Sequence, residues 1–284
     1  MTEAEKQYID LYAEASEAIK EHSAEVMNAV RDRAFEDFRR QGFPTRKVER
    51  YKYTDMEKIF APNYGLNINR IEFPVDPYAA FRCDVPNLST LLYFVVNDAF
   101  YEKRLPNVQP EEGVVIGSLK KAAEEHPELI ARYYARIAKT EEDAITALNT
   151  MLAQDGLFIY VPKNVQMEKC VQIINILRAD VSMMVNRRVL IVMEEGAKAK
   201  FLFCDHTADD HDFLATQVIE AYVGDNASLD LYCMEETHYK NHRVSNVYIE
   251  QQRDSRVNHN VITLHNGVTR NRLDLVFKGE GAEC

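Results

Sequence analysis

The hydrophobic pattern changes its period along the chain. From about Glu3 to Gln41 apolar residues recur at helical spacing, with Val26, Val30, Ala34 and Phe38 at four-residue steps along one face. Gly42 before Phe43-Pro44 is a strong stop, because glycine accepts left-handed conformations and proline cannot continue a helix. After Asp155-Gly156, short apolar strands separated by turn residues dominate. We therefore predict a helical N-terminal region and a strand-rich second half.

The pattern between these parts is mixed. Ala61 to Pro86 carries four prolines, which predicts an extended crossing segment, and Leu91–Val96 is a continuous apolar run typical of a buried strand. We expect Ser118 to cap a helix that Pro127 restarts and that runs to Lys139. Thr140-Glu141-Glu142-Asp143 resembles a capping box before a helix with Ala144, Ile145, Leu148, Met151 and Leu152 on one face. We divide the chain into a helical region (1–60), a mixed α/β connecting region (61–155) and β-coils (156–284).

Turn triplets recur through the strand-rich half. They are centred on Gly196, Asn226, Asp254 and Gly281, at intervals of 30, 28 and 27 residues. One repeat of short strands cannot bury its own apolar face, whereas stacked coils can, so this period predicts a parallel β-helix with these residues at equivalent corners. The last coil, which contains Leu273–Phe277, has no following coil in the sequence. We expect its edge to pair with a second copy of the chain, or else to fray and aggregate.

Composition narrows the function classes. The chain has 284 residues, 46% apolar, with a formal net charge of −11 and a pI near 5.3. This charge argues against a nucleic-acid partner, because phosphate binding depends on lysine and arginine. The basic run between Arg31 and Lys52 is interleaved with acids and is interpreted as a solvated helix face. No apolar segment resembles a signal peptide or a membrane span, which predicts a cytoplasmic protein.

Five widely spaced cysteines fit a reducing compartment. Without a Cys-x-x-Cys pair or a secretion signal, we expect them to be free thiols; they are Cys83, Cys170, Cys204, Cys233 and Cys284. Cys204 and Cys233 lie one repeat apart, and a buried apolar role is the favoured interpretation for each.

The densest polar segment is Cys204–Asp212. Its thiol, its two histidines (His206 and His211) and its four aspartates are ligand types for zinc or iron, but their spacing matches no ligand signature. A hydrophilic excursion between two coils is the favoured interpretation. His259 and His265 share one coil and would lie on one face only if no bend intervenes. No phosphate-binding loop, nucleophile elbow or HExxH motif occurs, so we identify no catalytic residues and leave metal and cofactor ligands unassigned.

Several stretches resemble the SufB/SufD family of the SUF iron–sulfur cluster assembly machinery. The segment 42–54 is similar to the family's N-terminal motif, and Arg46–Thr54 favours the SufD branch, with Tyr51 where the family usually has tryptophan. The segment 143–161 is similar to the entry into the family's β-helix. The later coils are matched by 253–256, 269–273 and 279–282.

The resemblance implies a mainly β fold, a right-handed parallel β-helix preceded by an α-helical N-terminal region. It also implies a non-catalytic scaffold subunit that supports cluster assembly and iron supply, together with SufB-like and SufC-like partners, SufC being the ATPase. We expect no resident cofactor, with iron or an iron–sulfur cluster present only transiently in the full complex. Family members continue through further coils and a helical domain, so we expect this chain to lack their C-terminal part, including the interface Cys/His positions and the SufC-docking surface. Cys284 is not a substitute for them.

A β-helix carbohydrate-active enzyme, either a polysaccharide lyase or a hydrolase, is the alternative. Such enzymes need acids clustered on one face of successive coils. The acidic pairs Glu194-Glu195 and Glu235-Glu236 lie about one and a half repeats apart and cannot be paired from sequence. The scaffold hypothesis predicts no enzymatic turnover and no stoichiometric metal.

Overall fold

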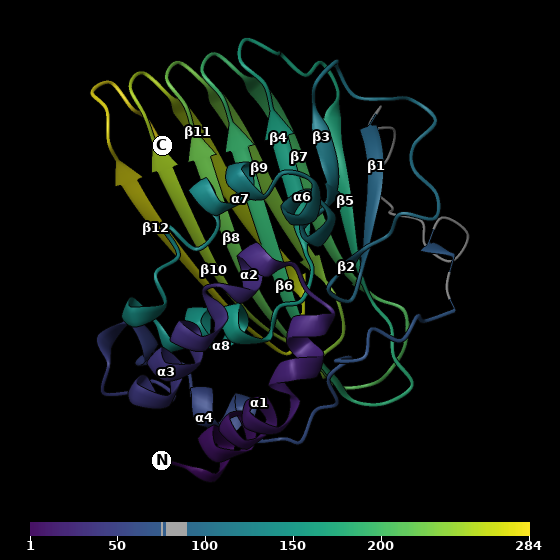
Figure 1. Cartoon of the computed structure of the whole chain (residues 1–284), viewed down its shortest axis with the longest axis vertical. Coiled ribbons are helices and arrows are strands. Elements are labelled where there is room, and N and C mark those ends of the chain that lie inside the picture. Colours follow the sequence, from purple (N-terminus) through teal and green to yellow (C-terminus); the bar gives the residue numbers. More distant parts are fainter. Residues whose placement is uncertain (75, 78–89) are drawn as a thin grey trace.

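The structure is a computed structural model that describes residues 1–74, 76–77 and 90–284. Figure 1 shows long strands stacked in two layers, with most of the helices gathered at one side of the stack. The helices are α1 (Glu3–Glu21), α2 (Glu25–Asn28), α3 (Arg31–Gln41), α4 (Met56–Phe60), α6 (Leu119–Glu125), α7 (Pro127–Tyr133) and α8 (Ala144–Leu152), with 3-10 turns η1 (Glu49–Tyr51) and η2 (Thr140–Glu142). The strands are β1 (Thr90–Val96), β2 (Ala99–Phe100), β3 (Val115–Ser118), β4 (Leu157–Val161), β5 (Cys170–Leu177), β6 (Met183–Met193), β7 (Lys198–Thr207), β8 (Phe213–Val223), β9 (Ser228–Glu236), β10 (His242–Gln251), β11 (Arg256–His265) and β12 (Val268–Phe277).

The strands form a parallel β-solenoid, as predicted. In the described part of the chain, sheet A has the order β3-β4-β6-β8-β10-β12 and sheet B the order β2-β1-β5-β7-β9-β11. The chain crosses between the sheets after each strand from β5 onward, so strands two apart in sequence pair in parallel. β1–β2 and β3–β4 are antiparallel. Because β1, β2 and β3, which precede residue 156, also join the sheets, the division of the chain at residue 156 stays a prediction.

The coils shorten along the stack. In sheet A, Leu157 pairs with Val189, 32 residues later, and His242 pairs with Val268, 26 residues later. Each pairing joins equivalent positions, so one coil supplies the backbone partners of the next.

The predicted corners are equivalent. Gly196, Asn226, Asp254 and Gly281 all have positive φ, between 55° and 72°. The N–H of Gly196 donates to Asp225 O at 2.8 Å, that of Asn226 to Arg253 O at 2.8 Å, and that of Asp254 to Glu280 O at 2.9 Å. A left-handed backbone favours glycine, asparagine and aspartate, which explains why these residue types mark the period. Asn164 (φ 62°) is a further corner of this kind, which the interval pattern missed.

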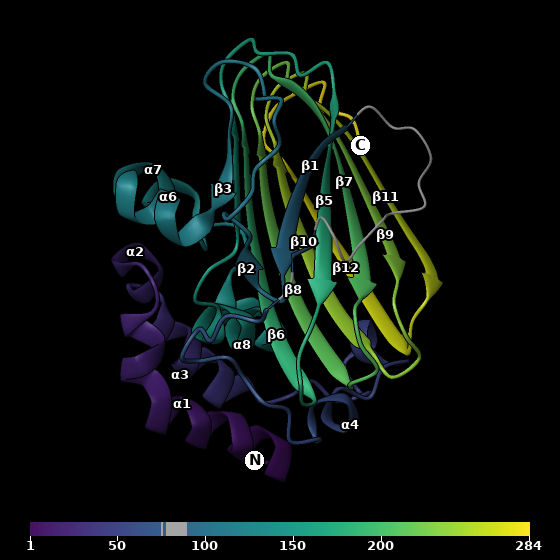
Figure 2. The ribbon, with the colours of Figure 1, turned by 90° about the vertical axis from the view of Figure 1, so that its right-hand side faces the viewer.

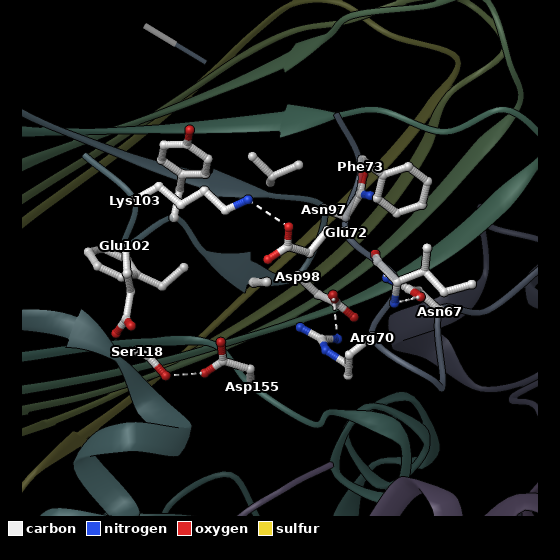
Figure 3. A pocket seen from close by; sticks show the side chains of 15 residues that line it. Asn67, Arg70, Glu72, Phe73, Asn97, Asp98, Glu102, Lys103, Ser118 and Asp155 are labelled. Carbon is white, nitrogen blue, oxygen red and sulfur yellow. Dashed lines mark hydrogen bonds and ion pairs between the residues drawn. The ribbon is translucent and has the colours of Figure 1, made fainter. Parts of the chain in front are cut away.

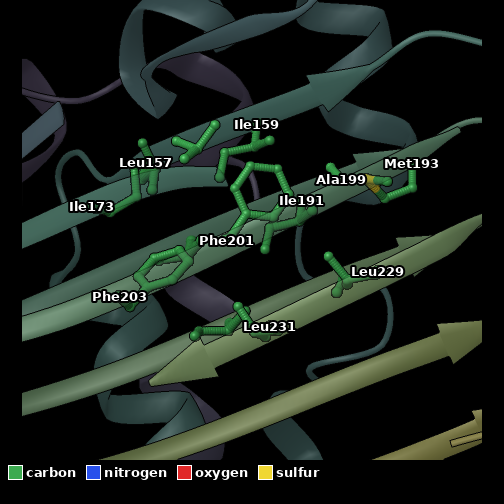
Figure 4. Packing of buried hydrophobic residues seen from close by; sticks show 14 of the residues in the cluster. Leu157, Ile159, Ile173, Ile191, Met193, Ala199, Phe201, Phe203, Leu229 and Leu231 are labelled. Carbon is green, nitrogen blue, oxygen red and sulfur yellow. The ribbon is translucent and has the colours of Figure 1, made fainter. Parts of the chain in front are cut away.

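The apolar core lies between the two sheets. Figure 4 shows Ile191 and Met193 of sheet A beside Ile173, Phe201 and Leu229 of sheet B, all buried. These side chains occupy alternate strand positions, which all point to one face of a strand. Every coil therefore adds one layer to the same core.

The helices cover the outer face of sheet A, and Figure 2 shows them on the side opposite sheet B. One cluster packs residues of α1, α3, α4 and α8 against Met184, Leu214 and Val244. A second cluster packs α2, α6 and α7 against Phe158 and Leu190. Sheet A is thus buried on both faces.

The N-terminal helical region differs in detail from its prediction. It is broken into α1, α2 and α3. Helix α3 ends at Gln41, and its C-cap residue Gly42 has φ 62°. The predicted single apolar face is divided, because Val26 and Val30 pack in one cluster while Ala34 and Phe38 pack in the other.

The helix predicted to reach Lys139 is shorter. Ser118 accepts from Lys121 N and Pro127 begins α7, as expected, but α7 ends at Tyr133. The backbone N–H groups of residues 135–138 donate to the carboxylate of Glu220 instead of continuing the helix. The predicted capping box is also wrong: Asp143, not Thr140, is the N-cap of α8. The crossing segment predicted over 61–86 lies partly outside the described residues.

Gly196→Ala tests the corner geometry. Alanine would have to adopt the left-handed backbone conformation of Gly196, and its Cβ would lie 2.4 Å from Asn164 Oδ1. We therefore expect the free energy of unfolding to fall by about 1–3 kcal/mol. Gly117→Ala is the matched control, because its Cβ would meet nothing within 4 Å. Urea denaturation of both variants measures the difference. Equal stability of the two variants would contradict the corner assignment.

Candidate functional site

The interior between the sheets has a polar half beside its apolar half. Arg187 of β6 lies two residues before the core residue Val189, so its side chain also points inward. It contacts Asp205 of β7, which belongs to the opposite sheet. Arg243 of β10 and Glu235 of β9 complete the group. We call these four residues the interior ion network; each is at most 5% exposed at its side chain.

Asp205 is the centre of this network. Its Oδ1 accepts from Arg187 Nη1 at 2.8 Å and from Asn175 Nδ2 at 2.7 Å, while its Oδ2 accepts from Arg243 Nη1 at 2.5 Å. Arg243 Nε lies 3.4 Å from Glu235 Oε1, so one guanidinium bridges two carboxylates.

Neutral donors complete the coordination of Glu235. Thr263 and Thr269 hydroxyls donate to its Oε2 at 3.1 and 2.8 Å, and Asn266 Nδ2 donates to its Oε1 at 2.5 Å. The network therefore holds two carboxylates and two guanidinium groups whose charges balance inside the solenoid.

The electrostatics follow from burial and from this pairing. Burial acts to raise the pKa of Asp205, but Arg187 and Arg243 outweigh it, and the pKa is lowered. Burial raises the pKa of Glu235, with Arg243 opposing the shift. A buried charge is tolerated only when it is paired and hydrogen-bonded, and both carboxylates meet that condition.

Cys233 lies inside the solenoid near this network. Burial raises the pKa of its thiol to about 12, although Arg243 opposes the shift. A thiol with this pKa stays protonated at neutral pH, whereas the thiolate is the form that attacks electrophiles and binds metals. Cys233 is therefore not an activated nucleophile.

A second polar cluster joins the helical region to the last coil; we call Tyr51, Asp143, Arg270 and Arg272 the junction cluster. Asp143 Oδ2 accepts from Tyr51 Oη at 2.6 Å and from Arg272 Nη1 at 2.8 Å. Its Oδ1 caps α8 through the N–H groups of Ile145 and Thr146. The Arg270 guanidinium lies 3.8 Å from the centroid of the Tyr51 ring, within cation–π range.

The polar segment Cys204–Asp212 does not form one cluster. Its first residues end β7, so successive side chains alternate between faces: Cys204 packs in an outer apolar cluster and Asp205 points inward. Asp209 accepts from Ala179 N at 2.9 Å. Within the described ranges, no three His, Cys, Asp or Glu side chains are placed to hold a metal ion.

The remaining cysteines and histidines are also separated. The four described cysteines are free thiols, and Cys83 lies outside the described residues. Cys204 and Cys233 are both buried, as interpreted, but Cys204 pairs with Met234 and therefore lies on the opposite face from Cys233. A register shift between Thr263 and His265 breaks the alternation of side chains in β11. His265, which is exposed, therefore does not follow the regular alternation from His259, which is half-buried.

The two acidic pairs are not brought together. Glu194 and Glu195 follow β6 at the corner end of the solenoid, whereas Glu235 and Glu236 end β9, which runs away from that corner. Glu235 is 1% exposed and belongs to the interior ion network. A pair of acids on one solvent-facing surface, which glycoside cleavage needs, is not formed by these residues.

Comparison with known families assigns both parts of the chain. Residues 2–173 match the family model described as the SufBD protein N-terminal region. Residues 175–284 match that of the SUF system FeS cluster assembly, SufBD core domain. The chain belongs to the SufBD family. The resemblance of the three sequence stretches is thereby confirmed.

Curated SufBD relatives cover parts of the chain. The iron–sulfur cluster assembly protein SufD of Bacillus subtilis is 29% identical over 185 residues, which are 64% of this chain and 41% of that protein. The SufBD family protein slr0074 of Synechocystis is 32% identical over 124 residues, 42% of this chain and 25% of the relative. The chloroplastic SufBD family protein ABCI8 of Arabidopsis thaliana is 32% identical over 122 residues, which are 42% of this chain and 21% of that protein. The matches thus span about two fifths of these relatives or less. None of the described helices is both long and apolar enough to cross a membrane.

The three SufBD-like stretches meet in the junction cluster. Tyr51 comes from the first stretch, Asp143 from the second, and Arg270 with Arg272 from the third. The interior ion network was missed by sequence reasoning. Its signal was the unusual Asn186-Arg187-Arg188 triplet inside the otherwise apolar strand β6, because charged residues are rarely buried without partners.

Asp205→Asn tests the balance of the interior ion network. It keeps the side-chain shape but leaves two buried guanidinium groups around a neutral amide, so we expect a loss of about 3–5 kcal/mol in the free energy of unfolding at pH 7. The folded-state pKa of Asp205 is lowered, so its contribution is complete above the unfolded pKa of about 4 and is lost as the pH falls through the folded value. The difference between wild type and variant should therefore shrink below about pH 4.

Chemical denaturation between pH 3 and 7 measures this difference. Asp180→Asn is the control, because that carboxylate pairs with Arg178 while 76% exposed and should change stability by less than about 1 kcal/mol. An Asp205→Asn variant as stable as this control would show that the network is not a compensated charge cluster.

Proposed function

We propose that this chain is a non-catalytic scaffold subunit of a SUF iron–sulfur cluster assembly complex, acting with SufB-like and SufC-like partners. The observation that carries the proposal is the near-continuous match of SufBD family models over residues 2–284, laid on a solenoid whose buried charges neutralise one another. The curated relative named SufD is described as an iron–sulfur cluster assembly protein. Iron or a cluster would be cargo of the complex rather than a resident group of this chain.

The chemistry of the described residues supports a scaffold role. The interior carboxylates are engaged by guanidinium and hydroxyl donors, and the nearby Cys233 thiol is protonated at neutral pH. The carbohydrate-enzyme alternative has less support, because its candidate acids lie at different ends of the coils. Free cysteines fit work in the reducing cytoplasm, which we retain as part of the proposal.

The outermost strands supply a surface for assembly. In the described part of the chain β12 ends sheet A and β11 ends sheet B. Glu283 bridges the start of β11, and the rest of each strand's outer edge has no strand partner among the described residues. Apolar side chains are exposed on these strands, at Ile262, Leu264, Leu273, Val276 and Phe277. Exposed edges of this kind favour pairing with another chain. We propose that a partner subunit, or a second copy of this chain, covers them.

Co-purification tests the proposed complex. A tagged chain expressed with the SufB-like and SufC-like proteins of its source should retain the ATPase subunit through gel filtration. The chain expressed with an unrelated ATPase is the control. Elution of the tagged chain alone in every combination would contradict its role as an assembly subunit.

Light scattering across a dilution series tests the edge. We expect a dimer that dissociates on dilution, and we expect Val276→Lys to shift the chain to monomer because a charge on β12 would be desolvated in the contact. Val181→Lys, at an exposed valine outside the edge strands, is the control. A chain that stays monomeric at high concentration, with slow amide exchange in residues 273–277, would refute pairing through this edge.

A further inference from the structure

A pocket opens beside the first strands of the solenoid. It adjoins the interior ion network, because Arg187 Nε donates to the carbonyl oxygen of Asn97, a lining residue, at 3.0 Å. It has a volume of about 360 Å³ and is lined by Asn67 and residues 70–73, by residues 96–103 of the β1–β2 hairpin and the segment after it, and by Ser118 and Asp155. Figure 3 shows the charged groups of Arg70, Asp98, Glu102 and Asp155 around this space. The volume lies in the range of small-molecule sites.

Arg70 is the only guanidinium group among the described lining residues, and it is already engaged. Arg70 Nη1 donates to Asp98 Oδ1 at 2.8 Å, and the two side chains are only 17% and 13% exposed. This pair neutralises one of the two acids at the floor of the pocket.

Asp155, the other acid, has no such partner. Its Oδ1 accepts from Ser118 Oγ at 2.8 Å and from Lys120 N at 3.0 Å, both neutral donors. Among the described residues, no lysine, arginine or histidine nitrogen forms an ion pair with its carboxylate. Burial raises the pKa of Asp155, with Arg70 opposing the shift, as expected for a carboxylate short of positive charge.

The described lining residues carry an excess of negative charge. Their carboxylates are Glu72, Asp98, Glu102 and Asp155, against the cations Arg70 and Lys103, and Lys121 outside the lining pairs with Glu102 at 4.0 Å. Lys103 is held at the rim, where its Nζ lies 2.6 Å from Glu72 Oε2 and both groups are mostly exposed. Apolar wall is supplied by Ile71, Phe73 and Val96. The site thus combines an uncompensated carboxylate with hydrocarbon surface.

We propose that this pocket binds a small organic ammonium ion, whose N–H groups donate to Asp155 and whose hydrocarbon part lies against Ile71, Phe73 and Val96. A charge-assisted hydrogen bond to a partly desolvated carboxylate is stronger than a neutral one. A carboxylate ligand would face the lining's excess of like charge. A bare metal ion would need several oxygen ligands, and the described residues provide no group of three acidic, thiol or imidazole side chains.

Titration with n-butylammonium chloride, followed by amide chemical shifts, tests the proposal. We expect saturable shifts at Asp98, Ser118 and Gly156, and no such shifts with n-butanol or sodium butyrate at equal ionic strength. Asp155→Asn keeps an acceptor for Ser118 and Lys120 but removes the charge, so binding should weaken at least ~10-fold. Glu112→Gln, at an exposed position outside the pocket lining, is the matched control.

A second variant keeps the proposal testable if Asp155→Asn does not fold. Phe73→Ala removes hydrocarbon wall without changing charge, and it should weaken n-butylammonium binding more than methylammonium binding. Butyrate binding as tightly as butylammonium, an unchanged affinity in Asp155→Asn, or no saturation up to about 50 mM would each overturn the proposal.

Discussion

Each strand of the β4–β12 stack forms its backbone hydrogen bonds with the equivalent strand one coil away. Leu157 pairs with Val189, and His242 pairs with both Leu214 and Val268, so a coil in isolation would leave its main-chain groups unpaired. This constraint fixes the direction of the side chains wherever the strands pair in regular register, which excludes the register shift in β11. It places one face of each strand in the shared interior and the other under the helices or outside sheet B. A charge on the inner face must then be neutralised from a neighbouring coil or from the opposite sheet, and Asp205 between Arg187 and Arg243 meets that requirement.

The same constraint explains what the sequence could predict. Corners need a left-handed residue at each turn, so Gly196, Asn226, Asp254 and Gly281 mark the period directly. Long-range polar partners cannot be found this way, because Arg187 meets Asp205 across the sheets and Glu220, on the outer face of sheet A, meets the turn after α7, far away in sequence. A metal site in Cys204–Asp212, the less favoured alternative, would need neighbours in sequence to be neighbours in space. In a strand, successive side chains diverge.

The helical region is tied to the stack as well as packed on it. Apolar residues of α1, α3 and α8 contact the outer face of sheet A, and Asp143 links Tyr51 to Arg272 of β12. Both SufBD family regions therefore contribute to one junction at the outermost described strand of sheet A. This arrangement agrees with the proposed role, in which strand edges are presented to partners while the polar interior is engaged internally.

The most direct test of this account is the metal content of the chain after anaerobic purification from cells supplied with iron and sulfide. A scaffold whose interior charges neutralise one another should carry far less than one equivalent of iron or zinc and show no cluster absorbance, both before and after mild chelation. About one equivalent of either metal, retained through gel filtration, would contradict the account. Its loss in His206→Ala or His211→Ala would place the site in the segment Cys204–Asp212.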